Sequence, residues 1–422
     1  MEQKIYNEYV EILKEELLPA MGCTEPIAVA YAAAVAVQAL GEKPESVEVN
    51  VSANIIKNVK SVVVPCTGGL RGIGAAVCAG IVAGCPEKEL EILEEITGEQ
   101  KVEMKKMLDT MPMTIRESDK EYIFDIQIKA CAGGHSGYVE IAGFHTNVIC
   151  VKKDDEIIRE KAYEEQGSSC ATDRSLLTVE KIIEFADCVD VADVEEVLQR
   201  QIDYNWAIAE EGMTGNWGAA IGKTLMEAYG NSVHNRAKAM AAAGSDARMN
   251  GCELPVVINS GSGNQGMTTS LPVIVYAKEL NVSKEMMLRA LFVSKLITIH
   301  MKTGIGRLSA YCGAISAGCG AGAGICYLYG GRAYEISHVI VNAVAINSGV
   351  VCDGAKASCA AKIASAVEAG LLGLQMQKNG KQFYGGDGLV EKGVENTIRN
   401  IGELAKKGMR ETDKTIIQIM TR

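Results

Sequence analysis

The feature that most constrains the fold of this chain is a change in its hydrophobic pattern near residue 190. Between about residues 41 and 185, short segments alternate apolar and polar side chains, which is typical of strands with one buried face. From about residue 190 onward no strand pattern remains, and helical segments follow one another between glycine-rich loops. The sequence therefore predicts an α+β fold, in which an α/β domain with a mostly antiparallel sheet accompanies a larger all-helical domain.

The domain boundaries follow from the same pattern. Residues 1–40 predict two N-terminal helices separated by a break at residues 19–26, where Thr24 is a candidate helix cap. Residues 41–185 form the predicted α+β domain, and residues 190–422 form the all-helical domain. Within the α+β domain we expect strands at residues 47–52, 62–65, 122–130, 138–142 and 146–152, and helices at residues 72–83 and 87–109.

The composition excludes several classes of protein. The 422 residues carry a formal net charge of −11 and only 5% aromatic side chains, which argues against nucleic-acid binding, because phosphate recognition needs basic patches. The N-terminal residues are charged and lack an apolar signal segment, so we expect a cytoplasmic protein whose 14 cysteines are reduced. The apolar runs at residues 314–328 and 336–351 are short for membrane spans, and we expect no membrane association.

Three cysteines near the C-terminal end are the main candidates for a metal centre. Cys312, Cys352 and Cys359 lie in glycine- and alanine-rich sequence, separated by 40 and 7 residues. Three thiolates in a small-residue pocket can hold three corners of a cubane iron–sulfur cluster and leave the fourth iron open as a Lewis acid. The spacing matches neither ferredoxins nor zinc fingers. Cysteine is also a common small core residue, as Cys319 and Cys326 illustrate by continuing the helical spacing from Cys312.

A glycine-rich loop at residues 259–266 is the candidate anion site. It contains eight consecutive residues without an apolar side chain, and glycine exposes backbone N–H groups that can surround an anion. The alternative is an ordinary connection between two helices. The loop is not a P-loop, because the Gly-Lys-Ser/Thr ending is absent. The predicted substrate-binding residues of this loop are Asn259, Ser260, Gly261, Ser262 and Asn264.

The Met-Gly-Cys-Thr-Glu-Pro segment at residues 21–26, the loop at residues 259–266 and the three cysteines together resemble the L-cysteine desulfidase family. This family is related to the catalytic chain of the oxygen-sensitive, iron–sulfur L-serine dehydratases, and the resemblance covers nearly the whole chain. It implies a [4Fe–4S] cluster on Cys312, Cys352 and Cys359, with Cys23 as a catalytic residue or fourth ligand. In serine dehydratases the last two cysteines are more widely spaced, and a terminal cysteine can cap the cluster. Here the chain ends in Met-Thr-Arg, which favours the desulfidase branch.

The resemblance implies a lyase that takes a small amino-acid substrate, L-cysteine, to pyruvate, ammonia and sulfide through aminoacrylate. The alternatives are an L-serine dehydratase with the same cluster, a non-catalytic iron–sulfur protein and a structural zinc protein. Pyridoxal phosphate is not expected, because no glycine-rich phosphate cup accompanies a suitable lysine. The cluster would be oxygen-labile. Helices faced with alanine and glycine also suit a homodimer interface.

Four further residues are assigned to the site. Cys23 precedes a predicted helix, whose N-terminus favours a thiolate, so it is the candidate general base or the ligand that substrate displaces; the alternative is a buried thiol. Glu25 is expected to orient the substrate ammonium, and Thr24 to bind substrate, although both also suit a first helical turn. Lys356 lies between two predicted ligands and either neutralises the cluster or holds a carboxylate; a surface lysine is the alternative.

The surroundings of the site are predicted from chain position. Because Cys23 must reach the cluster, residues 1–40 are expected to pack on the helical domain, with the active site at the junction. His300 and Lys302, just upstream of Cys312, are expected to border the site, and Arg307 is expected to contact substrate. The histidines of the α+β domain, His135 and His145, flank predicted strands and are interpreted as hydrogen-bonded structural residues.

Overall fold

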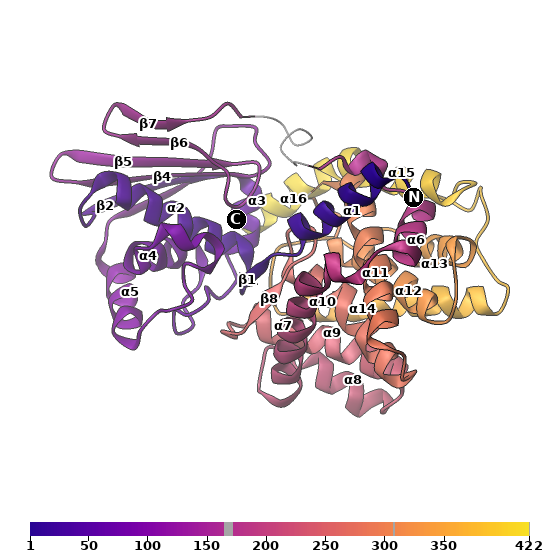
Figure 1. Cartoon of the computed structure of the whole chain (residues 1–422). Coiled ribbons are helices and arrows are strands. Elements are labelled where there is room, and N and C mark those ends of the chain that lie inside the picture. Colours follow the sequence, from indigo (N-terminus) through magenta and orange to yellow (C-terminus); the bar gives the residue numbers. More distant parts are fainter. Residues whose placement is uncertain (164–171, 307–308, 422) are drawn as a thin grey trace.

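In the computed structural model, residues 1–163, 172–306 and 309–421 are described, and they form a sheet unit beside a larger body of helices (Figure 1). The α+β class predicted from the sequence is confirmed. The six-stranded sheet has the order β3-β2-β4-β5-β6-β7, and all neighbours are antiparallel except β2 and β3, which are parallel. Its strands are β2 (Ser46–Val51), β3 (Met113–Glu117), β4 (Asp125–Ala132), β5 (His135–Ala142), β6 (Val148–Lys153) and β7 (Glu156–Glu160).

The strands that the sequence missed are the two edges of the sheet. Strands β3 and β7 are almost entirely exposed, so they carry no alternation between a buried and a solvent face. The strand expected at residues 62–65 is wrong, because only Val63 forms an isolated bridge, to Arg71. Pro65 cannot donate to a sheet, and Cys66 turns the chain at φ 59°.

Four helices belong to the sheet unit. The helix predicted at residues 72–83 is present with those bounds, whereas the segment predicted at 87–109 is divided into a 3₁₀ turn (Pro86–Glu91) and α5. Thr97 and Gln100 form a capping box that starts α5. The helices are α2 (Thr24–Leu40), α3 (Ala53–Val59), α4 (Gly72–Ala83) and α5 (Gly98–Thr110).

The helical body is organised around close contacts between small residues. Where α12 crosses α14, a Cβ placed on Gly370 would lie 2.3 Å from the carbonyl oxygen of Gly318, so only glycine permits this approach. None of the described helices is long and apolar enough to cross a membrane. The remaining helices are α1 (Gln3–Glu16), α6 (Val179–Cys188), α7 (Glu195–Thr214), α8 (Ile221–Tyr229), α9 (Val233–Met249), α10 (Gly263–Glu279), α11 (Lys284–Ile305), α12 (Gly313–Leu328), α13 (Ala333–Ile346), α14 (Cys359–Lys378), α15 (Val394–Glu403) and α16 (Arg410–Thr421).

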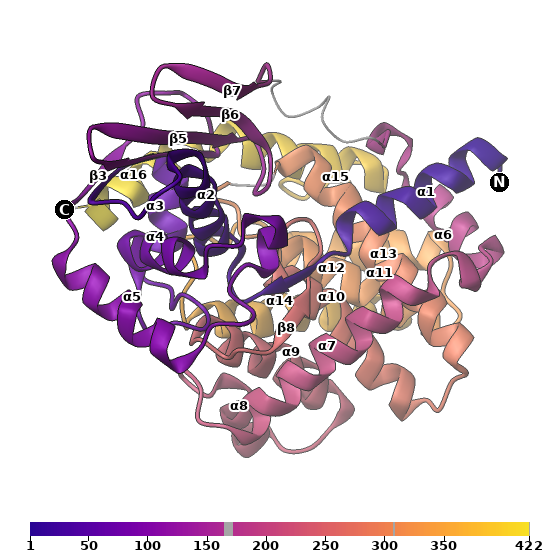
Figure 2. The same cartoon turned by 60° about the vertical axis from the view of Figure 1, so that its left-hand side comes forward.

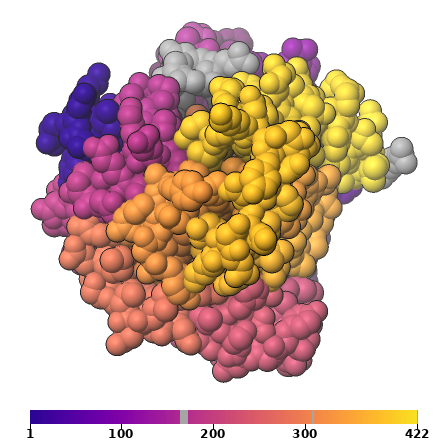
Figure 3. Space-filling model, turned by 90° about the vertical axis from the view of Figure 1, so that its right-hand side faces the viewer, coloured from indigo at the N-terminus to yellow at the C-terminus, as the bar shows by residue number. Residues whose placement is uncertain are grey.

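The two N-terminal helices pack in different places. Helix α1 joins the core of the helical body, where Tyr9 contacts Phe185, and it borders the face shown in Figure 3. Helix α2 lies on the sheet instead, so the expectation that all of residues 1–40 pack on the helical domain is wrong for α2. The physical reason is that α2 is buried on nearly every side, and Gly137 of β5 lets its backbone approach Ala36 closely.

Between these helices the chain forms β1 (Pro19–Met21), which pairs antiparallel with β8 (Pro255–Val257). Strand β8 is an exception to the all-helical prediction for residues 190–422. It is only three residues long, too short for a periodic pattern to show in the sequence. The pairing places the residues after β1 beside the loop after β8.

The C-terminal helix returns to the sheet unit. Both views place α16 next to α3 (Figures 1 and 2), and Lys57 of α3 forms an ion pair of 2.5 Å with Asp413 of α16. Lys57 is buried, so this pair lies in the interior rather than on the surface. The first and last parts of the chain therefore meet at the junction of the two units.

Candidate active site

A cavity of ≈ 120 Å³ lies where the sheet unit meets the helical body. The chain reaches it through the residues after β1, the loop after β8, and the starts of α10, α12 and α14. Segments far apart in sequence thus form one wall. The predicted site residues that line it are Cys23, Glu25, Ser260, Gly261, Ser262, Asn264, Cys312, Cys352 and Cys359.

The three candidate metal-binding cysteines are placed by helix starts and a backbone bridge. Cys312 is the residue before α12, and Cys359 is the first residue of α14. The Cys312 N–H donates to Val350 (3.0 Å) and the Cys352 N–H donates to the carbonyl of Ala310 (2.6 Å), which brings these two cysteines together. Three positions separated by 40 and 7 residues therefore meet at one cavity.

The thiols of Cys312 and Cys352 have different electrostatic surroundings. A hydrogen bond from Cys312 lowers the pKa of Cys352, and the nearby ammonium groups of Lys57 and Lys362 lower it further against the effect of burial. The same interaction with Cys352, together with burial, raises the pKa of Cys312 well above its usual value. Cys352 is therefore the thiol of this pair that ionises first.

Among the described residues, no three His, Cys, Asp or Glu side chains are arranged to hold a single metal ion. A cubane cluster makes a different demand, because each thiolate binds its own iron and the ligands stand apart. Cys312, Cys352 and Cys359 all line the cavity, and Cys359 packs against the small cluster that contains Cys23. The donor set of soft sulfur atoms fits an iron–sulfur cluster.

Cys23 and Glu25 form a hydrogen-bonded pair in the cavity wall. Cys23 directly precedes α2, and its thiol donates to Oε2 of Glu25 at 3.1 Å. Burial raises the pKa of Cys23 well above its usual value, and the charge of Glu25 raises it further. Burial therefore opposes the thiolate that was expected from the helix N-terminus, because desolvation disfavours the charged form.

Thr24 holds Glu25 rather than capping the helix. No side chain caps α2, and the residue before it is Cys23. The Thr24 hydroxyl lies 3.1 Å from Oε2 of Glu25 and 3.3 Å from the carbonyl oxygen of Gly261. It is absent from the cavity lining, and its hydroxyl is already used in connecting Glu25 to the loop.

The loop after β8 is a tight turn that exposes the start of α10. Asn259 and Ser262 exchange two backbone hydrogen bonds of 3.1 Å, and Ser260 and Gly261 between them have φ values of 51° and 76°. Asn259 is fully buried and accepts a hydrogen bond from Ser260 (3.0 Å), so it supports the turn and does not line the cavity. A left-handed serine is uncommon, and such strain gathers at functional sites.

The basic residues of the cavity include Lys302, which was expected there, but not Lys356. Lys356 pairs with Asp353 at 2.5 Å and is absent from the lining, because the turn before α14 points it toward that carboxylate. Lys57, Arg248 and Lys302 line the cavity instead. Of these, sequence reasoning identified only Lys302. Nothing in the local sequence distinguishes Arg248 from the other basic residues of α9, Arg236 and Lys238.

The histidines also differ from expectation. His145, interpreted as structural, lines the cavity, and its ring makes an edge contact with Phe124 at 4.9 Å between centroids. His135 lies on the surface, 3.0 Å from Asp154. His300 does not reach the cavity, because it is bound to Glu395 (2.6 Å), and Arg307 lies outside the described residues.

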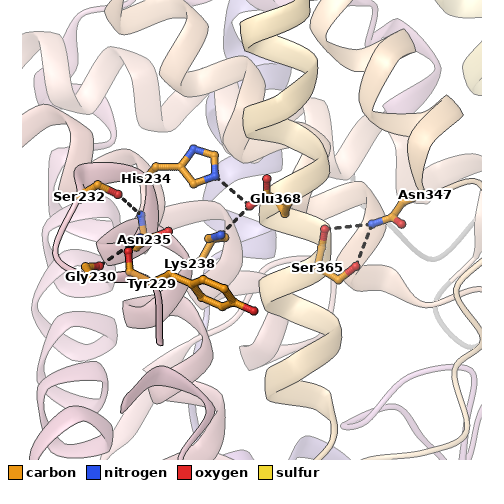
Figure 4. A network of polar contacts seen from close by, with 9 residues as sticks. All are labelled: Tyr229, Gly230, Ser232, His234, Asn235, Lys238, Asn347, Ser365 and Glu368. Carbon is orange, nitrogen blue, oxygen red and sulfur yellow. Dashed lines mark hydrogen bonds and ion pairs between the residues drawn. The ribbon is translucent and has the colours of Figure 1, made fainter. Parts of the chain in front are cut away.

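A polar network supports the helices that carry the site. Lys238 and His234 of α9 both contact the carboxylate of Glu368 on α14, at 2.6 and 2.8 Å (Figure 4). Asn347 adds a hydrogen bond of 3.0 Å to the backbone of Ser365. Helix α9 ends near the cavity and α14 begins there, so the network fixes their relative position at a distance from the site.

Comparison with known proteins identifies the family of the chain. Residues 87–418 match the family model described as serine dehydratase alpha chain. A UPF0597 protein of Desulfitobacterium hafniense is 59% identical over 419 residues, covering 99% of this chain and 97% of that protein. The chain belongs to the UPF0597 family.

Other UPF0597 proteins extend the relationship. One from Lachnoclostridium phytofermentans is 50% identical and covers 99% of this chain and 100% of its own. One from Bacteroides fragilis is 36% identical and covers 98% of both chains. A serine dehydratase alpha chain domain therefore makes up most of this UPF0597 protein and includes Cys312, Cys352 and Cys359.

Proposed function

We propose that the chain is a [4Fe–4S]-dependent lyase that eliminates hydrogen sulfide from L-cysteine, giving pyruvate and ammonia. The observation that carries this proposal is the meeting of four cysteines, 23, 312, 352 and 359, at one cavity with the glycine-rich loop after β8. The match with serine dehydratase alpha chains supports the reaction class. It also makes L-serine the second candidate substrate, since the thiol and the hydroxyl occupy the same position on the amino acid.

In this proposal Cys312, Cys352 and Cys359 hold the cluster. When bound, the cluster supplies an open iron that acts as a Lewis acid toward the leaving sulfur or oxygen. Cys23 lines the same cavity and would be the fourth protein ligand of the cluster in the absence of substrate.

The chain's own residues bind and orient the amino acid. The turn at residues 260–262 and the first turn of α10 present backbone N–H groups to the α-carboxylate. Glu25, fixed by hydrogen bonds from Cys23 and Thr24, faces the α-ammonium as a carboxylate. These two contacts place the α-carbon between the loop and the Cys23–Glu25 pair.

We assign removal of the α-proton to the Cys23–Glu25 pair, whose sulfur and oxygen atoms are 3.1 Å apart. The Cα–H and Cβ–S bonds break, a Cα=Cβ bond forms, and sulfide leaves. The α-proton remains on the pair. The resulting aminoacrylate tautomerises to an imine, and water hydrolyses the imine to pyruvate and ammonia.

The experiment is anaerobic purification of the full chain, followed by measurement of iron, acid-labile sulfide and lyase activity. We expect sulfide and pyruvate in equal amounts from L-cysteine, and loss of both iron and activity in Cys352→Ser. The exposed Cys188→Ser variant is the matched control and should keep both. Iron retained at the wild-type level in Cys352→Ser would contradict the ligand assignment, and turnover of L-serine alone would replace the substrate.

A further inference from the structure

Arg248 is a buried cation in the wall of the cavity. Its side chain is only 3% exposed, at the end of α9. Its Nε donates to the carbonyl oxygen of Gly22 at 2.8 Å, and a terminal nitrogen donates to Oδ1 of Asn264 at 3.2 Å. Both acceptors are neutral, and no carboxylate of the described residues forms an ion pair with it. A buried guanidinium in this state is costly unless an anion enters the cavity that it lines.

The start of α10 supplies a second, independent feature. Its first three residues, Gly263, Asn264 and Gln265, have N–H groups without an acceptor inside the helix, and the Ser262 side chain does not cap them. A 17-residue helix also directs the positive end of its dipole toward this point. A Cβ placed on Gly263 would lie 2.5 Å from Nε of Arg248, so the guanidinium packs directly against the first turn.

We propose that Arg248 and the first turn of α10 together bind the α-carboxylate of the substrate and make the free carboxylate a condition of binding. Guanidinium and N–H groups converge on one anion, while Glu25 on the wall near Cys23 faces the opposite charge of the ammonium. The chain therefore accepts α-amino acids and rejects amides and amines of the same shape. This inference rests on the proposed function for the identity of the substrate, but its binding step needs no turnover.

The probes are L-alanine, which lacks a leaving group, and L-alaninamide, which lacks the carboxylate charge. Binding to the full chain is measured by titration calorimetry, before and after cluster loading. We expect L-alanine to bind and L-alaninamide to bind at least about 10-fold more weakly, the range expected for losing a charged hydrogen-bond partner. Equal affinity for the two probes, or no binding of L-alanine, overturns the inference.

Two variants test the residues. Arg248→Lys keeps the charge but loses the planar fork, and we expect L-alanine to bind about 10- to 100-fold more weakly. Asn264→Asp introduces a carboxylate next to both Arg248 and the helix start. It should occupy the place of the substrate carboxylate, so we expect a higher melting temperature and loss of L-alanine binding.

The control is Asn396→Asp. Asn396 also lies in the first turn of a helix, α15, and also accepts a hydrogen bond from an arginine, Arg399, but on the surface. It should leave L-alanine binding unchanged. Wild-type affinity in Asn264→Asp would overturn the inference even if Arg248→Lys failed to fold.

The failures of the two proposals are distinguishable. L-alanine binding that depends on Arg248, in a chain without lyase activity, sustains the carboxylate site and refutes the reaction. Lyase activity with an unchanged KM in Arg248→Lys refutes the carboxylate site and sustains the reaction.

Discussion

The contribution of the buried Asp246 carboxyl to the stability of the helical body decreases as the pH rises. This carboxyl is fully buried on α9 and accepts a hydrogen bond of 3.2 Å from the N–H of Gly222, near the start of α8, while its Oδ1 has no partner among the described residues. Burial raises its pKa from 3.8 to about 6. Below pH 3.8 the group is protonated in both folded and unfolded states, and its contribution is fully present.

Between pH 3.8 and about 6 the unfolded chain loses this proton while the folded chain keeps it, so folding becomes less favourable. The pKa difference corresponds to about 3 kcal/mol of stability lost by pH 7.5. Asp246→Asn keeps an oxygen for the Gly222 N–H and removes the charge. Relative to the wild type, it should therefore gain up to about 3 kcal/mol between pH 4 and pH 7.5.

The assay is urea unfolding followed by circular dichroism at several pH values, and the quantity compared is the difference between variant and wild type. Titrations common to both proteins cancel in this difference. Asp155→Asn, in the exposed turn between β6 and β7, reports the effect of losing a surface charge. A difference between Asp246→Asn and wild type that stays constant across this pH range would refute the reasoning.

Three further predictions concern packing and charge. Gly370→Val should destabilise the helical body by several kcal/mol, measured by calorimetry, because its Cβ would collide with the backbone of α12. Asp413→Asn should destabilise the chain by about 3 kcal/mol in urea unfolding, since it leaves buried Lys57 unpaired, and Lys57→Met combined with Asp413→Leu should recover most of this loss. A hydrogen bond from His234 holds the pKa of Glu368 at about 2, so its stabilisation is present above about pH 4.5 and is lost as the pH falls toward 2. Glu368→Gln should accordingly unfold at a higher pH in acid titration, and an unchanged acid midpoint would contradict this assignment.

From the sequence we could predict the helices and strands that have a recognisable hydrophobic pattern, and the site residues that lie in short motifs. The helix at residues 72–83 could be predicted from its run of small and apolar residues, and an inner strand such as β4 from the alternation of buried and more exposed side chains. The edge strands could not, since all four neighbours of a residue such as Ile115 in β3 are also half or fully exposed. Helix α2 has apolar residues on all sides, so its sequence indicates burial but not the partner against which it packs.

For the candidate site, sequence motifs identified the cysteines and the glycine-rich loop. The basic side chains that line the cavity became apparent mainly from the fold. Cys312, Cys352 and Cys359 share small-residue surroundings that a reader can find in the sequence. Arg248 reaches the cavity only because the β1–β8 pairing brings Gly22 within its range, and no local pattern records that contact. Conversely, Lys356 lies next to the cysteines in sequence but turns toward Asp353. The roles of these residues in catalysis, and the homodimer, stay predictions.

The ion pair between Lys57 and Asp413 can form only late in the synthesis of the chain, after α16 has been made. Lys57 is synthesised 356 residues before Asp413, so the lysine has no partner for this ion pair until α16 has been made. The three distal cysteines emerge before that closing helix does. A chain truncated before α16 would contain all four cysteines of the site and still lack the carboxylate that pairs with Lys57.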